Sequence, residues 1–155
     1  MSTHIIKTTQ NLPITLEEAW DFISSPHNLK TITPEHFGFD IINGIRPEDK
    51  MYAGQIIIYK LQPLPGMKVK WVTEISQVEQ QRYFIDEQRS GPYKMWHHQH
   101  FLKTIPGGVQ MDDIIHYEIP FGPIGEIANL LFVKKKLESV FEYRRVKLET
   151  LFGKM

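Results

Sequence analysis

The alternation between hydrophobic and polar positions changes its period along the chain, and each period predicts a different element. Residues 3–10 are rich in β-branched side chains and predict a first strand. In the segment "NLPITLEEAWDFIS", Thr15 followed three positions later by Glu18 has the pattern of a capping box. Apolar residues then recur at helical spacing, which predicts a helix whose apolar face is Leu16, Ala19, Trp20 and Ile23. A second short helix is expected between Pro26 and Pro34.

From Phe37 to about residue 119 the pattern has a period of two. The clearest case is "MKVKWVTEISQV", in which Trp71 faces away from Lys70. Such alternation is typical of an antiparallel sheet with one face in water. Ser-Gly-Pro at 90–92 and Pro-Gly-Gly at 106–108 have turn chemistry. We therefore expect consecutive strands to pair as hairpins.

After "PFGPIGE" the period becomes helical and predicts one helix of about 25 residues, twice the usual length. Its expected apolar face is Ile127, Leu130, Leu131, Leu137, Phe141, Leu148 and Leu151. The element order predicts an α+β fold, with two short helices after the first strand and a curved antiparallel sheet of about six to seven strands. Only the C-terminal helix is long enough to cover the apolar face of that sheet. Such an arrangement favours a concave, mostly apolar space between the two.

Composition narrows the class of protein. A length of 155 residues predicts a single domain, residues 1–155. Lys+Arg and Asp+Glu are both 18, so the formal net charge is zero and a nucleic-acid partner is not expected. The absence of cysteine excludes disulfide and thiol chemistry. We find no apolar run of membrane-spanning length and no signal-peptide pattern, so we expect a cytoplasmic protein without membrane insertion.

The candidate chemistry lies in "KMWHHQHFLK", which holds three histidines within four positions. Strand alternation places His98 and His100 on the same face as Trp96, with His97 on the other face. If the hairpins pair as expected, further polar side chains join this face, namely Asp86, Gln88, Asp113 and Tyr117. A slip of one residue in the register would turn the whole set outward.

Three interpretations compete for this polar patch. Two histidines at i and i+2, with Asp86 or Asp113, could bind a metal ion. His98 or His100 with Asp113 could move protons in catalysis, because the pKa of histidine lies near neutrality. The set could also be a polar anchor, in which the side chains satisfy one another or hold the polar end of an apolar ligand. The third interpretation is favoured, and neither a metal nor a cofactor is predicted.

Other conspicuous residues have a structural and a functional interpretation. Trp20 is expected in the core, whereas Trp71 and Trp96 are expected either in the core or in the lining of a cavity. For Arg144, near the end of the long helix, a surface ion pair or an interaction with the helix dipole is favoured. The alternative is a counter-ion at the mouth of a pocket.

Short motifs in the same order along almost the whole chain resemble those of a known superfamily. They are Pro26-His27-Asn28-Leu29, Ile32-Thr33-Pro34, Asp86-Glu87-Gln88 with Gly91-Pro92, Trp96-His97-His98-Gln99-His100, Met111-Asp112-Asp113 with Tyr117, Pro120-Phe121-Gly122-Pro123-Ile124-Gly125, and Phe141-Glu142-Tyr143-Arg144. This pattern is similar to small bacterial ligand-binding proteins of the START-like, or SRPBCC, superfamily. The branch includes polyketide cyclase/dehydrase-like proteins and the domain found with epimerase-like cell-division inhibitors. The resemblance implies the helix-grip fold.

The resemblance also implies a function class, but the superfamily uses one scaffold for carriers, sensors and enzymes. The expected partner is a small hydrophobic or aromatic molecule, lipid-, sterol- or polyketide-like, bound between the sheet and the C-terminal helix. The expected ligand-binding residues are Trp71, Asp86, Gln88, Trp96, His98, His100, Asp113, Tyr117 and Phe141. One alternative is a cyclase- or aromatase-type enzyme, and a second is a co-chaperone-like protein-interaction module with an exposed apolar patch.

Overall fold

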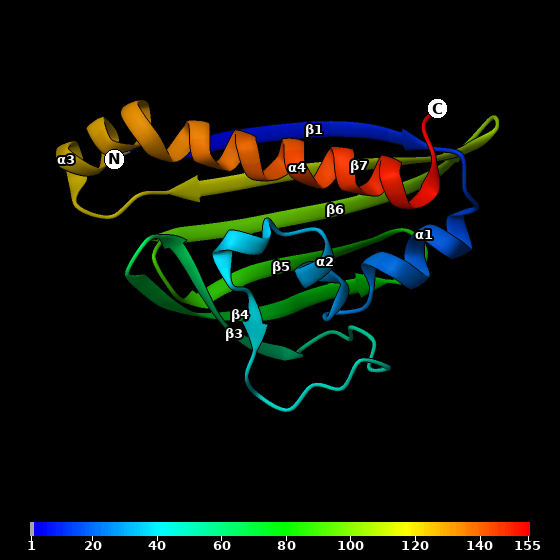
Figure 1. The fold of residues 1–155 in the computed structure, drawn as a ribbon, viewed down its shortest axis with the longest axis horizontal. Helices are drawn as coiled ribbons and strands as arrows, with labels where there is room; N and C mark the ends of the chain where they lie inside the picture. Colours follow the sequence, from blue (N-terminus) through cyan, green and yellow to red (C-terminus); the bar gives the residue numbers. More distant parts are fainter. Residues whose placement is uncertain (1) are drawn as a thin grey trace.

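One antiparallel sheet of seven strands, in the order β1-β7-β6-β5-β4-β3-β2, forms the body of the protein (Figure 1). The computed structural model describes residues 2–155. Its elements are β1 (His4–Leu12), α1 (Leu16–Ile23), α2 (Asn28–Thr31), η1 (Glu35–Phe37), β2 (Asp40–Ile41), β3 (Ile56–Leu64), β4 (Met67–Glu79), β5 (Tyr83–Ser90), β6 (Met95–Ile105), β7 (Gly108–Glu118), α3 (Gly122–Ala128), η2 (Asn129–Val133) and α4 (Lys134–Phe152). The predicted α+β architecture is confirmed. Within the described residues, no helix combines the length and the apolarity needed to cross a membrane.

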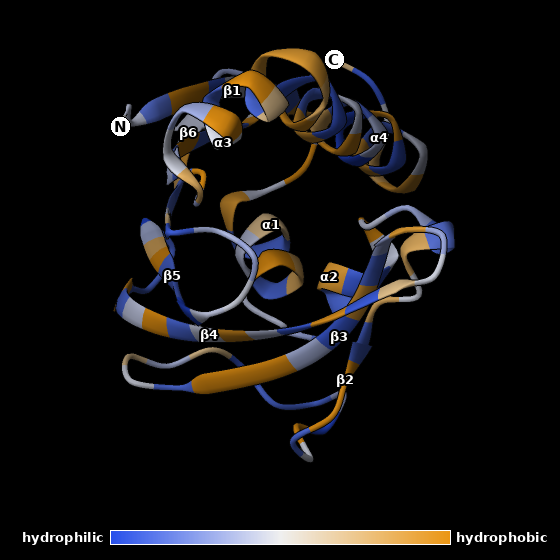
Figure 2. Cartoon of the chain, turned by 90° about the vertical axis from the view of Figure 1, so that its left-hand side faces the viewer, coloured by the Kyte–Doolittle hydropathy of each residue, from blue (hydrophilic) through white to orange (hydrophobic). Residues whose placement is uncertain are grey.

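The sheet curves around an interior that the helices cover from the other side (Figure 2). Irregular register between Ile75 and Gln77 of β4, opposite β5, marks one of the places where the ladder bends. The long C-terminal helix runs alongside β1 and β7 (Figure 1). Helix α1 lies near its C-terminal end, where Phe22 and Phe152 pack with ring centroids 5.2 Å apart, and α2 lies beside α1. The sheet therefore has one face toward the helices and one toward water, as the period of two predicts.

Helix α1 begins and packs as its sequence predicts. The backbone N–H of Glu18 donates to Thr15 Oγ1 at 3.1 Å, and the backbone N–H of Thr15 donates to Glu18 Oε2 at 2.8 Å, which completes the capping box. The helix buries Ala19, Trp20 and Ile23. Trp20 packs edge-on against Phe84 of β5 with ring centroids 6.3 Å apart, so its assignment to the core is confirmed.

Phe37 and Phe39 differ from the sequence prediction, which placed both in a strand. Phe37 ends the 3-10 turn η1, and strand β2 has only two residues, Asp40–Ile41. Pro34 lies just before the turn, and Gly38 closes it in the left-handed conformation with φ of 58°. Both phenylalanines are buried, so their alternation reflects packing of a loop on the core rather than a strand.

The long C-terminal helix differs most from the sequence prediction. It is continuous from Gly122 to Phe152, but a π-helical turn, η2, separates α3 from α4. The α4 part buries Leu137, Phe141 and Leu148 as predicted, but Leu151, predicted on the same face, is 45% exposed. In α3 and η2 the prediction was wrong, because Ile127, Leu130 and Leu131 are 59%, 74% and 53% exposed. The residues that face inward there are Gly125 and Asn129.

Two contacts explain why the small and polar residues face inward. A Cβ atom at Gly125 would lie 2.0 Å from the carbonyl oxygen of Pro120, so only glycine allows the helix to approach this closely. Asn129 Oδ1 accepts a hydrogen bond from the buried Tyr117 hydroxyl at 3.0 Å. The inward positions from Gly125 to Phe141 are four residues apart. A regular α-helix has 3.6 residues per turn, so positions four residues apart rotate gradually away from one face. The wider π turn has more residues per turn and reduces this rotation.

Gly125→Ala tests this close approach. In an unobstructed helix the change would stabilise by up to about 1 kcal/mol, because alanine has the better helix propensity. Here the added methyl group meets the Pro120 carbonyl, so we expect the free energy of unfolding to fall by about 1–3 kcal/mol in urea titrations. Ala128→Ser in the same helix serves as the control for a small change nearby. A Gly125→Ala protein as stable as the wild type would contradict the contact.

Candidate functional site

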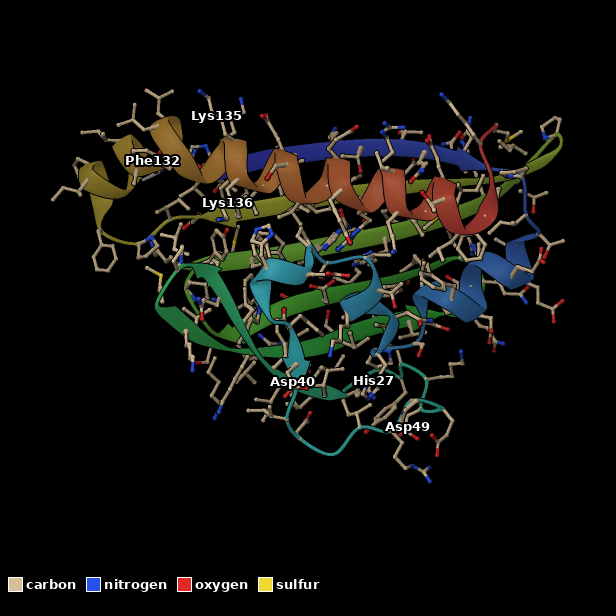
Figure 3. The ribbon with its side chains drawn as sticks, in the orientation of Figure 1. His27, Asp40, Asp49, Phe132, Lys135 and Lys136 are labelled. Carbon is tan, nitrogen blue, oxygen red and sulfur yellow. The ribbon has the colours of Figure 1, made fainter. Side chains whose placement is uncertain are left out.

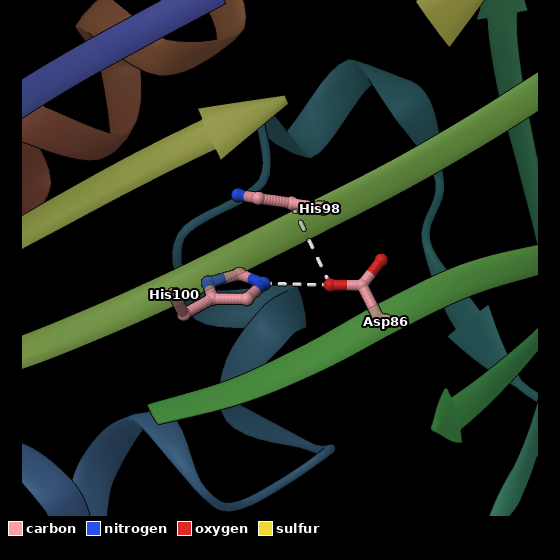
Figure 4. Close-up of side chains that lie close together, drawn as sticks. All are labelled: Asp86, His98 and His100. Carbon is pink, nitrogen blue, oxygen red and sulfur yellow. Dashed lines mark hydrogen bonds and ion pairs between the residues drawn. The ribbon is translucent and has the colours of Figure 1, made fainter. Parts of the chain in front are cut away.

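Two histidines and two aspartates form a closed cluster on the inner face of the sheet. The register places Asp86 of β5 opposite His98 of β6, and His100 opposite Asp113 of β7. His100 Nε2 lies 2.6 Å from Asp86 Oδ2 and His98 Nε2 lies 2.7 Å from Asp113 Oδ1. Figure 4 shows both histidines meeting Asp86, with His98 Nδ1 3.5 Å from Asp86 Oδ2. His100 Nδ1 lies 3.1 Å from Asp113 Oδ1, so each histidine faces both aspartates. Residues from three strands are thus brought together, as the hairpin pairing predicts.

The cluster is buried, and its two histidines differ in protonation. Burial, together with the charge of the neighbouring His100, lowers the pKa of His98. Burial alone would also lower the pKa of His100, but hydrogen bonds to Asp113 and Asp86 raise it. The two rings stack with centroids 3.7 Å apart, so a charge on one disfavours a charge on the other. The pair therefore holds a proton on His100 more readily than on His98.

Both carboxyl groups keep their charge despite burial. Burial opposes ionisation, but the charge of His98 and the hydrogen bond from His100 lower the pKa of Asp86. Hydrogen bonds from His100 and His98 hold the pKa of Asp113 well below its usual value against the same penalty. Carboxylates that accept hydrogen bonds in a poorly solvated site behave in this way.

Arg144 of α4 completes the charge balance. Its Nη1 lies 3.8 Å from Asp113 Oδ1, its side chain is only 16% exposed, and its guanidinium group lies 4.9 Å from the centre of the Phe141 ring. The favoured interpretation of a surface ion pair was wrong, because the helix turns this arginine into the interior. The guanidinium of Arg144 and a proton on His100 would together offset the charges of the two carboxylates. A buried set of charges is tolerable when it is neutral and paired.

A cavity adjoins the cluster between the sheet and α4. Its larger compartment has a volume of about 500 Å³ and its smaller one about 100 Å³. Trp71, Trp96, His98 and Arg144 line both compartments, so the two adjoin. The wall of the larger one is mainly apolar and aromatic, with Tyr59, Leu61, Trp71, Tyr93, Trp96, Leu137 and Phe141. Trp71 is the centre of this wall, since its ring lies 5.8 Å from Tyr59, 5.5 Å from Tyr93 and 5.4 Å from Trp96.

Two hydrogen-bond donors in this lining have no partner. Trp71 Nε1 and Arg144 Nε are both buried, and within residues 2–155 neither donates to any acceptor. Leaving a buried donor unpaired costs about 1–3 kcal/mol, so native structures rarely keep one without a partner. The two donors belong to residues that line the cavity.

The structure separates the sequence-predicted residues into three groups. Trp71, Trp96, His98 and Phe141 line the larger compartment, while Asp86 and His100 reach only the smaller one. Asp113 lies behind the histidines, toward β1 and α4.

Gln88 and Tyr117 do not line either compartment. Gln88 Nε2 donates to the Tyr93 carbonyl at 2.7 Å and its Oε1 accepts from the Tyr93 backbone N–H at 3.1 Å, so this amide holds the β5–β6 turn. The Tyr117 hydroxyl donates to Asn129 and packs the start of the long helix on β7.

Sequence reasoning missed several residues of the lining. Phe39 and Tyr93 come from loops, and Tyr59 comes from β3 at one side of the sheet. Tyr59 lies two positions after Ile57, which is fully buried, so period-two alternation would have predicted that Tyr59 faces the interior. The loop aromatics have no periodicity to follow.

The cluster also has a geometry that could hold a cation. Asp86, His98 and His100 each offer one ligand atom, all within 4.8 Å of one another. The guanidinium of Arg144 beside Asp113 already supplies positive charge to the same group. Each ring nitrogen also faces a carboxylate oxygen at 3.5 Å or less. The donor set therefore favours a self-paired network over a metal site.

No family model matches the sequence, and no curated protein matches it. Solved structures do match it in fold. A START superfamily protein from Mycobacterium smegmatis is 14% identical with a TM-score of 0.67, over 96% of this chain and 99% of that one. A protein from Chromobacterium violaceum is 12% identical with a TM-score of 0.72, over 98% and 99% of the two chains. Ara h 8.0201 is 11% identical with a TM-score of 0.62, over 96% and 99%. The chain therefore has the START-like helix-grip fold that its motifs resemble.

The protonation of His100 predicts a pH dependence of stability. The pKa of His100 is higher in the folded state than in the unfolded state, where it is about 6.5. The protonated His100 therefore stabilises the fold fully below pH 6.5, and this stabilisation is lost as pH rises through the pKa of the folded state. His98, with a lowered pKa, contributes a slope of the opposite sign that fades as pH rises above the unfolded value of about 6.5. We expect the wild-type free energy of unfolding to fall as pH rises above about 6.5.

Two variants test whether His100 causes this dependence of the unfolding free energy on pH. His100→Gln should cost about 3 kcal/mol at low pH, because it removes one partner of a buried ionic network, and should flatten the slope. His36→Gln, at an exposed histidine, is the control and should keep it. Urea unfolding at a series of pH values measures both. A wild-type protein with no slope above pH 6.5 would contradict the protonation of His100.

Proposed function

We propose that the protein binds a small, largely apolar or aromatic molecule in the cavity between the sheet and α4. The single observation that carries this proposal is an aromatic-lined space of about 500 Å³ with two unpartnered buried donors, Trp71 Nε1 and Arg144 Nε, in its wall. Pockets for small molecules typically measure about 300–1,000 Å³ and combine apolar walls with a few polar groups. The START-like fold of its structural neighbours is consistent with such a cavity but names no ligand.

The unpartnered donors define the polar end of the ligand. A carbonyl, hydroxyl, carboxylate or sulfonate oxygen of the ligand would accept from either donor once the side chain turns that donor toward the cavity. A neutral oxygen adds no charge to the cluster. An anionic group adds a negative charge beside Asp86 and Asp113, which favours uptake of a proton by the histidines of the cluster. An acidic ligand should therefore bind with proton uptake.

Arg144→Met and Trp71→Phe test the polar end with 1-anilinonaphthalene-8-sulfonate as an aromatic probe with acceptor oxygens. Hydrogen bonds to charged groups contribute about 1.5–3 kcal/mol, so Arg144→Met should weaken binding by about tenfold or more. Trp71→Phe keeps an aromatic ring and removes only the indole N–H, so it should weaken binding less, by about fivefold. Fluorescence titration measures each dissociation constant, and wild-type affinity should rise as pH falls toward 6.

Arg82→Met is the matched control, because Arg82 lies on an exposed turn with its side chain 71% exposed. It should bind the probe like the wild type. If Arg144→Met does not fold, because it leaves Asp113 with one cation fewer, Trp71→Phe still decides the question. The proposal fails if the wild type binds neither this probe nor fatty acids, and mass spectrometry finds no molecule retained in the purified protein.

The acid–base alternative has one observation in its favour. His98 has a lowered pKa, lines both compartments of the cavity and donates through Nε2 to Asp113, which is the pairing of a general base with an orienting carboxylate. A cyclase- or aromatase-type reaction would use His98 or His100 with Asp113. Against it, each ring nitrogen faces a carboxylate rather than the cavity alone. Turnover of an aromatic polyketide by the His98→Ala, His100→Ala double variant discriminates, since an unchanged rate removes the catalytic role.

A further inference from the structure

The start of the long helix has its apolar side chains on the outside. Six large apolar residues within twelve positions are exposed by 53–80%, and we call them the α3–η2 patch: Phe121, Ile124, Ile127, Leu130, Leu131 and Phe132. In the same segment the buried positions are Gly125 and Asn129. Ordinary surface helices have the reverse arrangement. Contiguous exposed apolar patches on soluble proteins mark interaction sites.

This arrangement is fixed by the core. Gly125 must face inward because a side chain there would collide with the Pro120 carbonyl, and Asn129 must face inward because it accepts the buried Tyr117 hydrogen bond. The helix cannot rotate to hide its apolar residues without breaking both contacts. The exposure of the patch is therefore a property of the folded protein.

Basic residues adjoin the patch. Lys134 and Lys135 are exposed, and within residues 2–155 neither forms an ion pair. Lys136, the third of the run, donates to the Pro63 carbonyl. Figure 3 places Phe132, Lys135 and Lys136 on the same end of the helix. From residue 127 to 137 the sequence has no acidic residue, and the nearest one before it, Glu126, is paired with His4 at 2.8 Å. The chain as a whole has no net charge, so this cationic border is local.

We propose that the α3–η2 patch docks on the surface of a membrane that contains anionic lipids. Apolar residues on a helix that lies in the interface enter the boundary between headgroups and acyl chains, while lysines reach the phosphates. Each lysine close to an anionic surface strengthens binding by roughly fivefold. A second copy of this chain fits less well. A two-fold interface would bring Lys134 and Lys135 of both copies together, with one acidic residue, Glu138, following them in the sequence.

The patch continues into the cavity. Phe121 and Ile124 belong to the patch and also line the larger compartment. A protein docked through these residues would have this side of the cavity at the lipid surface, where an apolar ligand is concentrated. This step rests on the proposed function, whereas docking itself does not.

Co-sedimentation with vesicles tests the docking. We expect the wild type to sediment with vesicles of phosphatidylcholine and phosphatidylglycerol, and more weakly with phosphatidylcholine alone. Leu130→Gln with Phe132→Gln should reduce binding by about tenfold or more, because both side chains leave the apolar face. Lys134→Gln with Lys135→Gln should reduce binding to the anionic vesicles by roughly 25-fold at low salt and weaken its salt dependence.

Tyr52→Gln with Leu151→Gln is the matched control, since these residues are 61% and 45% exposed elsewhere on the surface. It should bind like the wild type. Arg144→Met should also dock normally, so loss of the cavity ligand and loss of docking are distinguishable. The proposal is overturned if the wild type binds no anionic vesicles or if the patch variants bind as well as the control. It is equally overturned if light scattering shows that the patch holds two copies, or another protein, and vesicle binding is unaffected by the variants.

Discussion

The buried network of Asp86, His98, His100, Asp113 and Arg144 is the constraint on which the rest of the structure depends. Its side chains come from β5, β6, β7 and α4, so it fixes the register of three strands and the position of the helix at once. Each carboxylate is acceptable in the interior only with its cationic or donating partners in place. The aromatic wall and the cavity are built next to this network, and Arg144 and His98 belong to both.

Much of this arrangement follows from local sequence. Period-two alternation placed Trp71, Trp96, His98 and His100 on one face, and short turns made β5, β6 and β7 neighbours, so the meeting of the histidines with both aspartates was predictable. The capping box of α1 was predictable for the same reason, since both of its hydrogen bonds lie within four residues. Whether the site binds a ligand stays a prediction.

The errors share one cause, which is dependence on contacts that the hydrophobic periodicity does not contain. Helical spacing reveals that a helix has two faces but not which face the fold covers. In α3 and η2 that choice is made by Pro120 and Tyr117. Arg144 is interior because Asp113 lies beneath it, and no local pattern contains that contact. Gln88 shares the face of Asp86, but the nearby Tyr93 backbone takes both ends of its amide.

The π turn Asn129–Val133 lies between two parts of one continuous helix that must each turn a particular residue inward. These residues are Gly125 in α3 and Arg144 in α4. A π turn is commonly equivalent to one residue inserted into an α-helix. Deleting a single residue there would restore regular winding and rotate α3 against α4 by about 100°. Such a rotation would turn Gly125 and Asn129 away from their partners, so a deletion at this joint should persist in evolution only together with changes around Pro120 and Tyr117.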